Sequence, residues 1–165
     1  MPDFSTFTTL ELYKEDMKFS AAHFTIFSAT ARENLHGHNF RVHLVLELAV
    51  RADGMGIDYG IYKRRVRDLC KAWDEITLLP ARSPYLAIHA DEHHVHARFA
   101  GETLTFLKRD VLLLPIVNAT VEELARLMLE TLIRDLPATE RDDLRQATLK
   151  VYSGPGQSGA CTWRA

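Results

Sequence analysis

The feature that most constrains the fold is an alternation of residue types that runs from position 36 to position 48. Apolar side chains or histidines occupy every second position, and Asn39, Arg41, His43 and Glu47 lie between them. Because successive side chains of a β-strand point to opposite faces, this alternation predicts one long strand with a single buried face. That face would carry His36, His38, Phe40, Val42, Leu44, Leu46 and Leu48.

Two histidines stand at the entrance of this strand and indicate a metal site. His36 and His38 would project to the same side, and Gly37 between them adds no side chain. The stretch from Tyr13 to Phe24 reads as a preceding strand with His23 near its end, opposite the pair. Three imidazoles with one open position are typical of catalytic zinc. The alternative is that these histidines are ordinary polar residues of a strand start and a core.

Glu33 lies three residues before His36. Beside a zinc ion, such a carboxylate can be a ligand, a group that orients a ligand, or a general base. A base would need partial burial or a neighbouring negative charge to raise its pKa toward neutrality. The alternative reading is a solvated residue of the loop from Thr25 to Leu35.

The remaining patterns predict an α+β domain. Helical spacing of apolar residues predicts a helix over 59–73, and Thr120 followed by Glu123 is typical of the start of a second helix. Short strands are predicted at 85–90, 94–99 and 102–107, and two more close the chain around the turn GPGQSG. We therefore expect one domain over 1–165, with an antiparallel sheet covered on one face and an inserted hairpin at 84–117.

The amino-acid composition limits the kinds of partner that the protein is expected to bind. The net charge is −2 and the pI is near 6.4, without a basic block, which argues against nucleic acid and against a membrane surface. The longest apolar run, 111–117, is too short to cross a bilayer. Cys70 and Cys161 lie far apart, so free thiols in a reducing compartment are expected. These features predict a soluble, cytoplasmic protein.

Five short motifs together resemble the 6-pyruvoyltetrahydropterin synthase family, which includes the 6-carboxytetrahydropterin synthases. They follow one another in the family's order, from about Tyr13 to Arg164, and the pair FSAAHF with HGHNF is the most specific part. The motifs are FSAAHF at 19–24, HGHNF at 36–40, GMGIDY at 54–59, NATVEELA at 118–125 and KVYSGPGQSG at 150–159.

The resemblance implies a tunnelling fold, in which a small antiparallel sheet carries two helices on one face. Subunits join edge to edge into a barrel, so a homo-oligomer, a tetramer or a hexamer, is implied. It also implies that His23, His36 and His38 hold Zn²⁺, and that the partner is a small-molecule pterin substrate.

The sequence differs from the family pattern at the residue that acts as the catalytic base. Most members place a cysteine four to six residues before HGH, but here Thr30, Ala31 and Arg32 occupy those positions. The spacing E-x-x-H-G-H resembles a subgroup, the type III synthases, in which a glutamate replaces that cysteine. Members of the subgroup cleave the side chain of a dihydroneopterin to give 6-hydroxymethyl-dihydropterin. Glu33 is therefore the expected base.

Two further positions differ. The family has an Asp-His pair after the first helix; Asp74 matches the aspartate, but Glu75 stands at the histidine. An imidazole from the hairpin could replace it, or the hairpin histidines could simply be solvated. The family's pterin-gripping glutamate corresponds to Ser153, so Glu122 or Glu123 is an alternative anchor unless these two cap the helix. The hairpin histidines are His89, His93, His94 and His96.

Two functions of different classes follow. The first is a zinc-dependent lyase that acts on the side chain of 7,8-dihydroneopterin or its triphosphate, with Glu33 and Asp74 as catalytic residues and Glu122 and Ser153 as substrate-binding residues. The second is a zinc-binding family member that lacks the standard synthase activity. It would act on a different small molecule or serve as a binding or assembly subunit.

Overall fold

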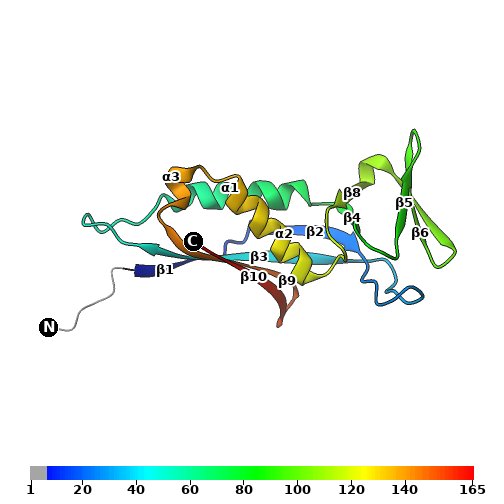
Figure 1. Ribbon diagram of the computed structural model, residues 1–165, viewed down its shortest axis with the longest axis horizontal. Helices are drawn as coiled ribbons and strands as arrows, with labels where there is room; N and C mark the ends of the chain where they lie inside the picture. The colour runs from blue at the N-terminus through cyan, green and yellow to red at the C-terminus, as the bar shows by residue number, and fades with distance from the viewer. Residues whose placement is uncertain (1–6) are drawn as a thin grey trace.

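The computed structural model describes residues 7–165, and its central element is a seven-stranded sheet (Figure 1). The strand order is β10-β9-β3-β2-β4-β8, and β1 pairs with the far half of β3. β1 and β2 therefore share one edge of the long strand, while β9 pairs along its other edge. The strands are β1 Phe7–Leu12, β2 Lys18–His23, β3 His36–Ala49, β4 Ile76–Pro80, β8 Val111–Leu114, β9 Leu144–Gly154 and β10 Gln157–Arg164.

Two main helices cover one face of this sheet. α1 (Tyr59–Ala72) and α2 (Val121–Arg134) share one core with β3, and the short α3 (Ala138–Arg141) follows them along the chain. In Figure 1, α2 crosses β3 diagonally. The Asp58 side chain accepts a hydrogen bond from the Gly60 N–H at the start of α1, and Thr120 accepts one from the Glu123 N–H at the start of α2. Apolar spacing predicted the first start and the Thr120–Glu123 pair the second, and in both a side-chain oxygen satisfies a backbone N–H group that the helix leaves unpaired.

The core forms between these helices and the inner face of β3. Phe40, Val42, Leu44 and Leu46 are completely buried, as the alternation predicts. The apolar faces of α1 and α2 pack on them and contribute, among others, Tyr62, Val66, Leu124 and Met128.

The inserted segment forms a separate three-stranded antiparallel sheet. Its strands are β5 (Ala87–Ala90), β6 (His94–Phe99) and β7 (Glu102–Leu107), and a 3-10 turn over Lys108–Asp110 leads back to β8. It stands at the end of the molecule opposite β1 (Figure 1). Alternate residues of β6 are buried in a second small core with Phe24 and Leu79, which connects the insert to the sheet beside β2.

Several elements differ from the sequence-based expectation. The strand that carries His23 begins at Lys18 rather than Tyr13, because a turn closed by the Met17 N–H and the Lys14 carbonyl precedes it. β1 was not predicted. β4 and β8 were not predicted either, and they add two parallel pairings, β2 with β4 and β4 with β8, to the otherwise antiparallel sheet.

The two cysteines are free, as expected from their spacing. Within residues 7–165, no helix combines the length and the apolar character needed to cross a membrane.

A candidate metal centre at the junction of β2 and β3

Strand pairing brings the three predicted histidines together. His23 of β2 lies directly opposite His36 of β3, and His38 follows two residues along the same face. Their ring centroids are 4.8 to 5.2 Å apart, and one nitrogen from each lies within 4.8 Å of the others. Phe40 supports the group from the core side, with its ring centroid 5.4 Å from that of His23 and 5.5 Å from that of His38.

Backbone carbonyls fix the orientation of two of these rings. The Nδ1 atom of His23 lies 2.7 Å from the Ala119 carbonyl oxygen, and Nδ1 of His36 lies 2.8 Å from that of Asn34. A carbonyl only accepts, so in both rings Nδ1 carries the proton and the neutral ring presents a lone pair at Nε2. Metal-binding histidines have this arrangement.

One of the inward-facing nitrogens lacks a partner. Nε2 of His23 is buried and has no hydrogen-bond partner among residues 7–165, whereas Nε2 of His36 and Nε2 of His38 lie 3.0 Å apart and share a hydrogen bond. Burial lowers the pKa of His23 and of His38, which favours the neutral form that binds metal. An orphaned buried nitrogen beside two converging imidazoles fits a resident Zn²⁺ ion.

Glu33 is tied to the strand end by two reciprocal hydrogen bonds. The Thr25 N–H donates to Oε2 of Glu33 over 2.9 Å, and the Glu33 N–H donates to the Thr25 carbonyl over 2.9 Å. Burial alone would raise the pKa of Glu33, but the Thr25 hydrogen bonds, with a smaller contribution from the nearby His36 and His23, outweigh it. The pKa is lowered. The upward shift that a base was expected to need is therefore not provided, and Glu33 is ionised at neutral pH.

Asn118 and Arg32 hold the loop that carries Glu33, and sequence reasoning missed both. The Asn118 side chain accepts from the Ile26 N–H over 3.0 Å and donates to the Ile26 carbonyl over 2.9 Å. The Arg32 guanidinium donates to the Glu33 carbonyl over 2.8 Å and lies over the Phe24 ring. Asn118 lies in the motif NATVEELA, but nothing in the sequence indicates its contact with Ile26, which is 92 residues away.

Two cavities adjoin His38. One, of about 610 Å³, is lined by Gly37, His38, Tyr152 and Ser153 together with the β9–β10 turn, so Ser153 and His38 line the same cavity. The other, of about 370 Å³, is lined by His38, Ser20 and Thr77 among others.

Asp74 and Glu122 lie away from these histidine cavities. The Asp74 carboxylate accepts the Ser20 N–H over 2.7 Å and lines a third cavity, of about 520 Å³, with Arg67 and Lys71. Ser20 lines this third cavity as well as the 370 Å³ one, so it connects Asp74 to the His38 side. Glu122 is exposed at the first turn of α2, whose backbone lies against Gly159 of β10.

The hairpin histidines form contacts within their own sheet. His94 and His96 both face the carboxylate of Asp91 in the β5–β6 turn. The hydrogen bond from His96 and those from the backbone of His94 and His93 hold the pKa of Asp91 well below its usual range.

Comparison with known proteins agrees with this geometry. Residues 11–162 match the family described as 6-pyruvoyl tetrahydropterin synthase. The chain is 25% identical over 146 residues to a putative 6-carboxy-5,6,7,8-tetrahydropterin synthase of Methanocaldococcus jannaschii, covering 88% of each chain.

Solved structures agree as well. The crystal structure of the 6-pyruvoyl tetrahydropterin synthase from Plasmodium vivax superposes with a TM-score of 0.92 at 28% identity, covering 98% of this chain and 100% of that one. A variant of the same enzyme, with a glutamate described as a catalytic residue replaced by alanine, superposes with a TM-score of 0.92 at 27% identity over the same shares. The chain belongs to the 6-pyruvoyl tetrahydropterin synthase family and is a lyase of that type.

Proposed function

We propose that this protein is a zinc-dependent lyase that acts on the side chain of a dihydropterin, 7,8-dihydroneopterin or its triphosphate. The observation that carries the proposal is the convergence of three imidazoles whose Nε2 atoms face a common point. Two of them are oriented by backbone carbonyls, and one Nε2 is buried without a partner. His23, His36 and His38 would hold the ion, and a fourth position would stay open for substrate.

Zinc, when bound, polarises an oxygen of the substrate side chain and so acidifies the adjacent carbon–hydrogen bond. Glu33 is proposed as the group that takes the proton. It is half-buried, ionised and within the electrostatic influence of His23 and His36. The P. vivax enzyme has a glutamate described as catalytic, which supports a carboxylate in this role. Because its pKa is low, Glu33 is a weak base, and the reaction would depend on the acidified substrate.

The 610 Å³ cavity is the proposed place of the pterin ring. Ser153 would contribute one hydroxyl there. Glu122, at the start of α2, does not line this cavity, so we propose it only for a part of the substrate that extends beyond the cavity. A hydroxyl cannot form the two-pronged charged contact of a carboxylate, so ring recognition would be weaker at Ser153. Asp74 is proposed to assist catalysis by position: its carboxylate accepts the Ser20 N–H and so holds the part of β2 that lines the 370 Å³ cavity beside His38. We also propose a cytoplasmic homo-oligomer, a tetramer or a hexamer, whose subunits close a barrel.

The test is a single-turnover assay on zinc-loaded protein. Dihydroneopterin, with and without its triphosphate, is incubated with the wild type and with Glu33→Gln, and the pterin products are separated by chromatography. We expect conversion by the wild type, and a loss of at least about 100-fold in Glu33→Gln because general-base catalysis contributes that much or more. Zinc content should stay unchanged. Glu130→Gln, on the exposed side of α2, is the matched control and should behave as wild type.

Ser153 favours a second candidate function, because the standard anchor of the pterin ring is replaced within the cavity itself. In that case the protein binds zinc but lacks the standard synthase activity, and acts on a different small molecule or as a binding or assembly subunit. Bound zinc with no conversion of either pterin by the wild type would select this alternative.

A further inference from the structure

The hairpin repeats the spacing of the metal-binding strand. His94 and His96 of β6 are two residues apart, as are His36 and His38 of β3. Val95, Ala97 and Phe99 on the opposite face of β6 are buried, so both histidines point outward. Their side chains are 40% and 30% exposed, which leaves them accessible while still in contact with their neighbours.

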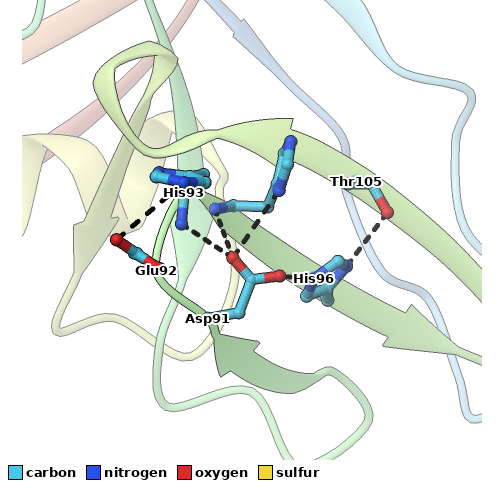
Figure 2. A network of polar contacts seen from close by, with 6 residues as sticks. Asp91, Glu92, His93, His96 and Thr105 are labelled. Atoms are coloured by element: carbon cyan, nitrogen blue, oxygen red, sulfur yellow. Dashed lines mark hydrogen bonds and ion pairs between the residues drawn. The ribbon is translucent and has the colours of Figure 1, made fainter.

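A carboxylate is held in front of these two rings. Oδ1 of Asp91 accepts the backbone N–H groups of His93 and His94, over 2.8 and 2.7 Å, and this fixes the carboxylate in the turn. Its Oδ2 lies 2.8 Å from Nε2 of His96, and Oδ1 lies 3.6 Å from Nδ1 of His94. Figure 2 shows the Asp91 carboxylate between the turn and the His96 ring, with Thr105 on the far side of that ring.

The far side of the His96 ring is also supported. Nδ1 of His96 lies 3.0 Å from the hydroxyl of Thr105 on β7. As the ring stands, Nε2 of His96 donates to the Asp91 carboxylate, and the Thr105 hydroxyl is placed to donate to Nδ1. Because this hydroxyl can also accept, the ring can move its proton to Nδ1 and release the Nε2 lone pair to a cation that takes the place of the Nε2 proton. In the first site the Nδ1 of His36 donates in the same way to the Asn34 carbonyl.

The ligand groups lie near one another, but they converge less closely than the three histidines of the first site. Ligand atoms about 2.0–2.1 Å from a tetrahedral ion lie roughly 3.3 Å from one another. Oδ2 of Asp91 lies 2.8 Å from His96 and its Oδ1 lies 3.6 Å from His94, so each ring is close to this distance from a different oxygen of the carboxylate. The centroids of His94 and His96 are 6.0 Å apart, against 4.8 Å for His36 and His38, so these two exposed rings must rotate toward each other on binding. A site that needs this movement binds more weakly than the first.

We propose that Asp91, His94 and His96 form a second metal site, on the outer face of the hairpin sheet, for a divalent transition-metal ion such as Zn²⁺. Two imidazoles and one carboxylate favour such ions over Mg²⁺ and Ca²⁺, which prefer oxygen ligands. The three groups come from the β5–β6 turn and from β6, so a bound ion would fasten the turn to the strand that follows it. The proposal does not depend on the lyase activity.

The test counts bound zinc by equilibrium dialysis against buffered free Zn²⁺, followed by elemental analysis. We expect about two ions per wild-type chain, the second at higher free Zn²⁺. The double variant His94→Ala/His96→Ala should lose only the weaker ion, and His36→Ala/His38→Ala only the tighter one. His93→Ala is the matched control: its side chain is 71% exposed, its backbone N–H remains, and both ions should stay bound.

Asp91→Asn is the second variant, because its amide oxygen can still accept the two backbone N–H groups of the turn. It should keep the circular dichroism spectrum and lower the affinity for the second ion by at least about 10-fold, as expected when one ligand is weakened. Saturation of the wild type at one ion that survives His94→Ala/His96→Ala, or a second ion that survives this double variant, would overturn the proposal. If the first site fails instead, the wild type binds one ion that only the hairpin variants remove.

Discussion

Phe40 supports the metal centre, and we expect its replacement by alanine to lower both the stability of the core and the affinity for zinc. The side chain is completely buried, stacks on Phe19 at a centroid distance of 4.8 Å, and contacts the edges of two of the three histidine rings. Replacing a core phenylalanine by alanine costs about 3–5 kcal/mol. Domains of ordinary stability have about 5–15 kcal/mol in total. We therefore expect Phe40→Ala to remove about a fifth or more of the free energy of unfolding.

The assay is urea denaturation of the metal-free protein, followed by a competition titration with a chromogenic zinc chelator. Because the rings of His23 and His38 lose their support, zinc affinity should fall by about 10-fold or more, as for other groups that position metal ligands. Phe27→Ala is the matched control: the same residue type, 66% exposed, should change stability by less than about 0.5 kcal/mol. Phe40→Leu keeps most of the side-chain volume, so its loss of stability should lie between those of Phe27→Ala and Phe40→Ala. A loss in Phe40→Ala no larger than in Phe27→Ala would refute the reasoning.

Three further predictions follow from the same contacts. Burial lowers the pKa of His23 in the folded protein below its ordinary value of 6.5, so the unfolded chain binds the proton more readily. The metal-free protein should therefore lose stability as the pH falls below about 6.5, as measured by urea denaturation across pH. His23→Gln should show a shallower dependence of stability on pH. In Gly159→Ala the new Cβ would lie 2.5 Å from the Glu122 backbone nitrogen, so we expect a loss of about 1–3 kcal/mol by thermal unfolding, and an unchanged melting temperature would contradict the close packing of β10 on α2. Asn118→Ala removes both hydrogen bonds to Ile26 and should cost about 1–3 kcal/mol and speed amide exchange in the loop before Glu33; unaltered exchange there would argue against its anchoring role.

The parts of the fold that were predictable are those with a strong local period. β3 alternates over its whole length, and the caps Asp58 and Thr120 mark the helix starts through contacts of two or three residues in sequence. β4 was missed because Leu78 and Leu79 belong to a short apolar run. Such a run fits a buried parallel strand and a buried helix segment equally well, so periodicity does not separate the two.

In the candidate site, too, local patterns could be predicted from the sequence and distant contacts could not. The three histidines could be predicted because the H-x-H spacing on a strand places two rings on one face. The residues that support these histidines could not be predicted, because the Ala119 carbonyl meets His23 across 96 residues and Asn118 meets Ile26 across 92. The direction of the Glu33 pKa shift was also out of reach, since it depends on the backbone N–H of Thr25.

The most direct test of the metal centre is a crystal structure of the protein loaded with one equivalent of zinc, with anomalous data collected at the zinc edge. We expect a single strong peak within about 2.0–2.1 Å of the Nε2 atoms of His23, His36 and His38, with one coordination position left for solvent or substrate. A zinc-loaded crystal with no anomalous peak among these three nitrogens would contradict the account.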